Sequence, residues 1–303
     1  GDLYASDYAG KSQVLNVIMS EEAGFDGNVT AAAKRLYTGY INRDIQGSAL
    51  IRRGASSINL SPGTGNNKQH EEGTDTITDI ASGEVLEFRR KFNSYFNGDP
   101  FIAGSWALER APDEAYRVNG RWQWSKFDLT QDNRITIGGE QQDDSLFQKY
   151  RNPFIEIGGD VTRPLAGGAI KFVALATRRK RNDFDEYLER DGLIDEPGTS
   201  VVDGFEQTVD ARRNETIGRA SWTHGDLLGF SFETGVEGAY NTLDYSVELL
   251  DIGEDGERSR VNLPIDDAVV KEKRGEVYFS LGRNLSPALR IDGGVNYEFS
   301  NLR

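Results

Sequence analysis

The stretch LRIDGGVNYEFS, residues 289–300, is the clearest guide to the fold. One set of alternate positions holds Leu289, Ile291, Gly293, Val295, Tyr297 and Phe299. The other set holds Arg290, Asp292, Gly294, Asn296, Glu298 and Ser300. A repeat of two residues with one apolar and one polar side is the pattern of a β-strand. The recurrence and length of this pattern decide whether the apolar side faces a protein core or lipid.

The same unit, two such strands joined by a short turn, occurs four times from about residue 98 onward. The turns are predicted near Pro112, Pro164, Gly225 and Pro287, at intervals of 52, 61 and 62 residues (164−112, 225−164 and 287−225). Long polar segments at 131–149, 178–204 and 248–267 separate the units, and we expect them to be loops. Short turns at one end and long loops at the other are typical of outer-membrane barrels.

Shorter strand-like tracts come before these units, at residues 28–37, 47–51, 56–60 and 83–92. Residues 74–79 and 84–91 are predicted to form a hairpin that projects beyond the main sheet.

Strand length supports a barrel in a membrane. The tracts 230–240 and 289–299 each span ten steps (240−230 and 299−289), which cover roughly 26 Å at ~3.4 Å per residue and a tilt near 40°. That length matches an apolar band of about 25 Å. We therefore expect an all-β fold, an antiparallel up-and-down transmembrane β-barrel, present as a partial barrel of about 10–12 strands.

Composition excludes several classes of protein. Hydrophobic residues make up 37 % of the 303 residues, and no run approaches the ~18 apolar residues of a membrane helix. The net charge of −14 repels phosphate backbones and argues against nucleic-acid binding. The chain has no Cys and only two His, which excludes disulfides, thiol nucleophiles and Cys/His zinc sites.

We predict no catalytic residues, no metal site and no cofactor, and we expect that the protein is not an enzyme. His224 is interpreted as a solvated turn residue, and His70 as part of a wet loop beside Glu71 and Glu72. A Ser/His/Asp triad would need one of these histidines. The basic run at 178–181 has two readings, a partner for lipopolysaccharide phosphates or a solvated rim.

In a barrel, the polar side of each strand lines the lumen and aromatic side chains gather at the membrane interfaces. The lumen-lining candidates are Arg117, Arg121, Glu156, Asp160, Glu233, Glu237, Arg290, Asp292, Asn296 and Glu298. The candidate membrane-interface aromatics are Trp106, Trp122, Trp124, Trp222, Tyr240 and Phe299. A soluble protein would bury the same aromatics in its core.

The N-terminal segment carries a family resemblance. Leu3-Tyr4, the run at 7–11 and the run Val14-Leu15-Asn16-Val17-Ile18 resemble the end of the plug domain in TonB-dependent outer-membrane receptors. The remainder resembles the first half of such a receptor's barrel, which in that family has 22 strands around a plug. The resemblance implies a plug end at 1–24 and the N-terminal half of the barrel at 25–303.

The resemblance also implies a function and partners. It implies a receptor in the outer membrane of a Gram-negative bacterium that imports a scarce small-molecule cargo with energy from TonB. Its partners would be outer-membrane lipid and lipopolysaccharide, and TonB through plug and N-terminal segments outside these residues. Two alternatives remain open: a passive, plug-free porin, and a secreted soluble all-β module for binding or adhesion.

Overall fold

The computed structural model describes residues 23–286 and 289–303. The predicted plug end at 1–24 therefore lies almost wholly outside the described residues. The elements are β1 (Gly24–Arg35), β2 (Ile41–Arg53), β3 (Ser56–Thr78), β4 (Val85–Gly98), β5 (Phe101–Ala111), β6 (Glu114–Ile137), β7 (Glu140–Leu165), β8 (Gly168–Arg190), β9 (Val201–Leu227), β10 (Phe230–Ile252), the short 3-10 helix η2 (Glu254–Gly256), β11 (Arg258–Arg260), β12 (Asp267–Ser286) and β13 (Leu289–Leu302).

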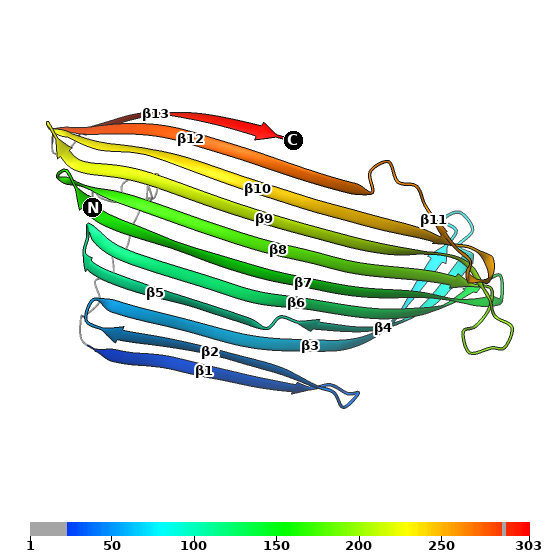
Figure 1. Cartoon of the computed structure of the whole chain (residues 1–303). Helices are drawn as coiled ribbons and strands as arrows, with labels where there is room; N and C mark the ends of the chain where they lie inside the picture. Colours follow the sequence, from blue (N-terminus) through cyan, green and yellow to red (C-terminus); the bar gives the residue numbers. More distant parts are fainter. Residues whose placement is uncertain (1–22, 287–288) are drawn as a thin grey trace.

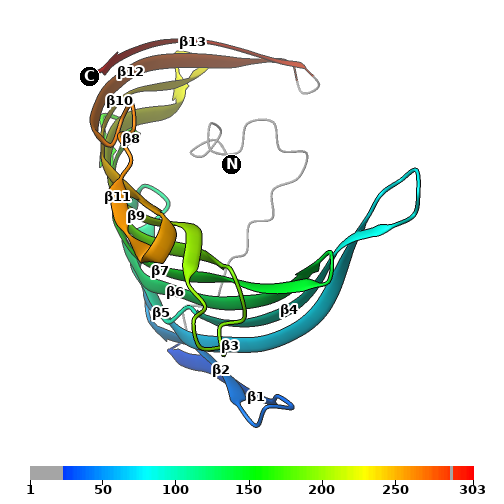
Figure 2. The ribbon, with the colours of Figure 1, turned by 90° about the vertical axis from the view of Figure 1, so that its right-hand side faces the viewer.

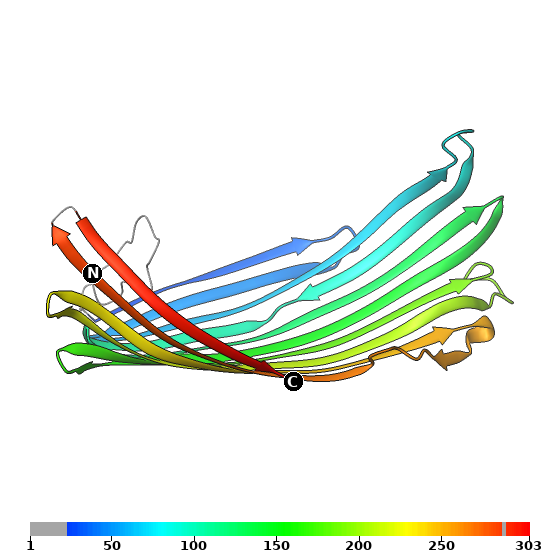
Figure 3. The same ribbon diagram turned by 90° about the horizontal axis from the view of Figure 1, so that it is seen from above.

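All described strands join one antiparallel sheet in which long neighbours follow chain order (Figure 1). The sheet curls into an open trough when viewed along its strands (Figure 2). From above, the strands run side by side at a slant (Figure 3). This is the all-β, up-and-down architecture of a partial barrel, as the two-residue pattern predicts. The predicted β3–β4 hairpin is present, and its tip projects from the trough (Figure 2).

Two of the thirteen strands, β4 and β5, act as one. The same register with β6 continues from Gly98↔Lys126 to Phe101↔Gln123. Pro100 interrupts the strand because a proline has no N–H to donate to the ladder. Its carbonyl still accepts a hydrogen bond from the Trp124 N–H at 3.0 Å. With β4 and β5 counted together and the three-residue β11 set aside, the described sheet has eleven long strands (13−1−1), within the predicted range.

The turn before β10 lies further along the chain than predicted. The chain reverses at Leu228-Gly229, where φ is 58° and 83°, and His224 lies inside β9. Two positive φ values are what a tight two-residue hairpin turn needs. Leucine rarely adopts that conformation, which is why the pattern predicts the turn near Gly225 instead.

Two of the three predicted long loops are wrong for most of their length, whereas the third, 248–267, is confirmed over 253–266, which contains only η2 and the three-residue β11. Residues 131–149 belong to β6 and β7, which meet at the tight turn Gly138-Gly139 with φ of 61° and 93°. Most of 178–204 likewise extends β8 and β9, and only 191–200 is irregular. Their polar composition reflects a solvated strand face, because hydrogen bonds between strands satisfy the backbone whatever the side chains are.

Fractional exposure identifies the inner face of the trough. On β10, Val236 is 52 % and Tyr240 42 % exposed, whereas Glu233 is 9 % and Ala239 7 % exposed. Side chains crowd together on the concave side of a curled sheet and spread apart on the convex side. The apolar face of β10 is therefore convex, and its polar face is concave.

The tight β6–β7 turn leads to a prediction. Replacing Gly138 and Gly139 together with alanine places two side chains at positive φ, at a cost of about 1–2 kcal/mol each. We expect faster amide hydrogen exchange in 131–146. Gly253→Ala is the control, because Gly253 has an ordinary φ of −85° and open space around it. Unchanged exchange in the double variant would contradict the hairpin.

Candidate binding face

The apolar and polar faces exchange sides partway along several strands. On β6 the outward residues run Tyr116, Val118, Gly120, Trp122, Trp124 and then Lys126, Asp128, Thr130, Asp132, Arg134. The inward residues of the same strand run Arg117, Asn119, Arg121, Gln123, Ser125 and then Phe127, Leu129, Gln131, Asn133, Ile135. The trough is apolar outside near the short turns, and polar outside beyond Trp124.

The neighbouring strands show the same exchange at matching heights. On β10 the outward side chains change from Val236, Gly238 and Tyr240 to Asp244, Ser246 and Glu248. On β9 they change from Trp222 and Ala220 to Arg212 and Asp210. On β8 the change comes at Arg178 and Lys180, at the start of the basic run noted in the sequence. A continuous apolar belt therefore ends in a charged border.

The ladders place all ten predicted lumen residues on the polar, concave side. Directly paired residues share a face in an antiparallel sheet. Arg117 pairs with Asp160 and Arg121 with Glu156, while Glu237 lies opposite Glu276, which lies opposite Glu298. The remaining candidates follow the same alternation: Glu233, Arg290, Asp292 and Asn296. Lumen lining stays a prediction, because the described sheet is open.

Several of these side chains are held together by ion pairs. Arg117 bridges Asp160 at 3.0 Å and Glu109 at 2.6 Å. Arg274 bridges Glu237 at 3.4 Å and Glu298 at 4.0 Å.

The other candidates have different partners. Arg219 is 3.9 Å from Glu233, and Arg290 bridges Asp292 at 2.9 Å. Asn296 donates to Glu276 at 3.4 Å. Arg121 donates to Gln123 at 2.8 Å, and it lines a polar hollow of 260 Å³ with Glu156, Asn59 and Asn119.

The six predicted interface aromatics all lie on the convex side and form two groups. The Trp106 indole N–H donates to Ser56 Oγ, and the Trp222 indole N–H donates to the Leu165 carbonyl, both at 3.0 Å. Ser56 and Leu165 flank short turns, so these two tryptophans lie at the short-turn rim. Trp122, Trp124, Tyr240 and Phe299 lie toward the charged border.

An aromatic row on the concave side, beyond the charged border, was not predicted from the sequence. It consists of Tyr95 on β4, Phe127 on β6 and Tyr150 on β7, all half-buried. The ring centroids of Tyr95 and Phe127 are 6.4 Å apart, and those of Phe127 and Tyr150 are 5.3 Å apart. Such spacings are typical of interacting aromatic rings. The change of apolar residues from even to odd positions on β6 indicates that Phe127 turns inward, but it does not indicate which rings Phe127 contacts.

Carboxylates flank the aromatic row at both ends. The Tyr150 hydroxyl donates to Asp185 at 2.8 Å, and Gln148 donates to the same carboxylate at 2.8 Å. The Tyr95 hydroxyl contacts Glu71 at 3.3 Å. Burial and, after it, the hydrogen bond to Asp185 together raise the pKa of Tyr150 to about 12. The row therefore stays neutral at physiological pH.

Three buried side-chain oxygens around the row accept no hydrogen bond. They are Asn93 Oδ1, Asn152 Oδ1 and Asp183 Oδ1, and all three side chains lie on the concave face. Asp183 lies directly opposite Tyr150 and is only 4 % exposed, and its carboxylate is paired with Arg181. Unsatisfied buried acceptors are uncommon in proteins and call for a donor from water or a ligand.

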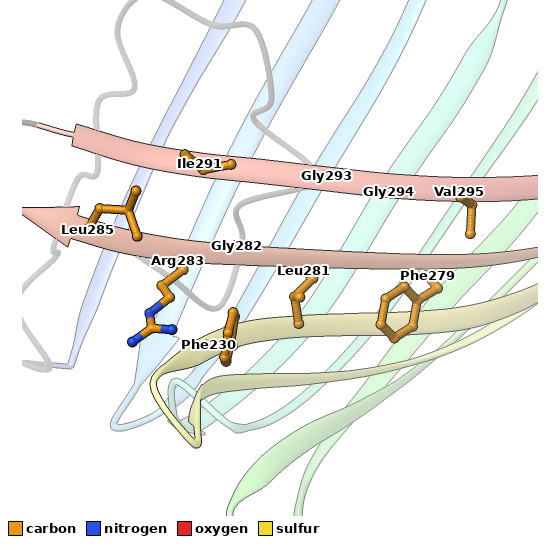
Figure 4. Close-up of a pocket in the computed structure, with 10 residues that line it drawn as sticks. All are labelled: Phe230, Phe279, Leu281, Gly282, Arg283, Leu285, Ile291, Gly293, Gly294 and Val295. Carbon is orange, nitrogen blue, oxygen red and sulfur yellow. The ribbon is translucent and has the colours of Figure 1, made fainter.

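The outer face carries an apolar hollow near the end of β12 and the starts of β10 and β13 (Figure 4). Gly293, which shares the outer face with Phe230, Leu281 and Ile291, leaves the hollow open because no side chain fills its position. The hollow has few polar groups to orient a ligand, and it belongs to the apolar belt.

No cluster of three or more metal-ligating side chains occurs within 23–286 and 289–303. Over those same residues, no helix has the length and apolar character to cross a membrane. Both histidines lie on strands: His70 forms an edge contact with Tyr37, and His224 lies beside Trp222.

The Tyr150–Asp185 contact leads to a second prediction. Asp185→Asn removes the charge that resists ionisation of the phenol, so the pKa of Tyr150 should fall from about 12 toward its ordinary value of 10.0. A folded-state pKa above the unfolded value stabilises the folded protein only while Tyr150 is protonated. As pH rises, this contribution to the free energy of unfolding should therefore be lost at a lower pH in Asp185→Asn than in the unaltered protein. Carbon NMR of labelled tyrosines, assigned with Tyr150→Phe, measures the shift. Asp191→Asn in the 191–200 segment is the control, and an unmoved Tyr150 titration would refute the contact.

No protein-family model matches the chain, and no curated protein matches it. Among solved structures, the chain is similar to the ferric yersiniabactin uptake receptor FyuA from Yersinia pestis, with 11 % identity and a TM-score of 0.29. The match covers 92 % of this chain and 51 % of that chain, so this chain spans about half its length. A likeness at this TM-score is too distant to assign a function.

Proposed function

We propose that the chain is part of an outer-membrane receptor that imports a small-molecule cargo with energy from TonB. The observation that carries the membrane assignment is the apolar belt on the convex side, which ends in charged residues while the concave side stays polar along the belt. Lipid-facing strands need an apolar outside, and the polar inside then lines a path.

Membrane insertion requires that the edge strands of the sheet be paired. Among the described strands, β1 and β13 each pair on one side only. Unpaired N–H and C=O groups cannot remain in hydrocarbon. The proposal therefore requires further strands that close the sheet.

The TonB-driven part of the proposal rests on the plug-like pattern at 3–18, which lies outside the described residues. The inner ion pairs fit it, because a polar wall can hold a polar plug through exchangeable contacts. We also propose that the chain has no catalytic role.

A passive porin would share the belt and the polar inner face. A soluble all-β module would instead cover the convex belt with protein, and Val236, Val277 and Phe279 would form part of a core. Exposures of 52 %, 50 % and 40 % for these residues favour lipid contact, because nothing in the described sheet covers them.

A charge placed in the belt tests the membrane assignment. In the full-length gene product folded into lipid vesicles, Val236→Arg should lower the free energy of unfolding by about 2–4 kcal/mol, because arginine then faces hydrocarbon. Ser246→Arg is the control: it lies on the same strand and face beyond the charged border, opposite Asp210 and Asp267. Urea titration measures both. Equal stability of both variants would rule out a lipid-facing belt.

Energy dependence separates active import from a porin. Growth on a limiting nutrient that requires the full-length gene should be lost when the cell's TonB is deleted, because no force would then displace the plug. The same strain carrying a TonB plasmid is the control. Uptake that persists without TonB would leave the porin as the better assignment.

A further inference from the structure

We infer that the aromatic row of Tyr95, Phe127 and Tyr150 is a binding site for a neutral, polyhydroxylated ring, the chemistry of a carbohydrate. The inference rests on the proposed function, of which it names the class of cargo. The row lies on the concave face beyond the charged border, where an incoming cargo would first meet the inner wall.

The rings supply the apolar part of the site. Three half-buried aromatic side chains from three adjacent strands form the row, with centroid steps of 6.4 Å and 5.3 Å and tilts of 36° and 32° between neighbouring rings. The C–H faces of a sugar can pack against these ring faces. A purely polar ligand would gain nothing from them.

The surrounding polar atoms supply the polar part of the site. Asn93, Asn152 and Asp183 each hold a buried oxygen without a donor. Hydroxyl groups can supply these donors, after small rotations of the side chains that cover the oxygens. An apolar ligand would leave all three acceptors unsatisfied.

Charge selects against other ligands. Glu71, Asp183 and Asp185 surround the row and Arg181 pairs with only one of them, so an anionic ligand such as a ferric chelate is repelled. The Asp185 carboxylate already accepts hydrogen bonds from Tyr150 and Gln148, and Asp183 is paired with Arg181. Two of the three free acceptors are neutral amides.

The test uses the full-length gene product purified in detergent and an array of neutral oligosaccharides, with ferric citrate as the anionic probe. We expect saturable binding to at least one oligosaccharide and none to ferric citrate. Phe127→Ala and Tyr150→Ala should each weaken that binding roughly tenfold, through loss of ring contact. Tyr150→Phe keeps the ring and should bind much more tightly than Tyr150→Ala.

Phe147→Ala is the matched control, because Phe147 lies on β7 with Tyr150 but on the opposite face, against Phe184. It should bind as the unaltered protein does. No binding to any oligosaccharide, binding to ferric citrate instead, or equal loss in Phe147→Ala would each overturn the inference. Binding in detergent does not involve TonB. The inference about the class of cargo can therefore be wrong while the TonB-deletion experiment supports active import, and the reverse is equally detectable.

Discussion

The unbroken hydrogen-bond ladder between neighbouring strands is the constraint on which the structure depends. β6 and β7 stay in one register from Ala115↔Thr162 to Ile137↔Glu140, across the height at which the surface changes character. Because side chains alternate with a period of two, a single inserted residue would turn every later side chain to the other face. The exchange of apolar and polar faces therefore follows from the order of residues in each strand and is not caused by a bulge.

Such registers give β6, β8, β9 and β10 two environments in series. Near the short turns, the outer side chains of β6 suit hydrocarbon and the inner ones suit water. Beyond Trp124 the outer side chains suit water, and the inner ones form a partly apolar wall. The backbone is satisfied in the same way in both parts, so the strands extend far past the apolar belt at no cost in unpaired N–H and C=O groups.

The fold class was predictable because the two-residue pattern holds over ten or more residues in 230–240 and 289–299. The extent of the strands was not. In 131–149 polar residues of both faces dominate the composition and hide the inward Ile135 and Leu146, so the pattern predicts a loop. The Leu228-Gly229 turn was missed because leucine rarely takes a positive φ.

The ten predicted lumen-lining residues follow from the two-residue alternation in the sequence alone, and the ladders place them on one face. The aromatic row could not be found in that way. Tyr95, Phe127 and Tyr150 come from three strands, and the sequence does not give their register. Pro100 hides the relation further, since it makes one continuous strand look like two.

The tight Gly138-Gly139 reversal has a kinetic consequence. It keeps the backbone on both sides of the aromatic row hydrogen-bonded up to the tip, so the row is not carried by a loop that must first become ordered. Only side-chain rotations separate the free wall from an occupied one, and the loss of chain entropy on binding is correspondingly small. We expect association at this wall to be governed by diffusion to the mouth of the trough and not by the closing of a lid.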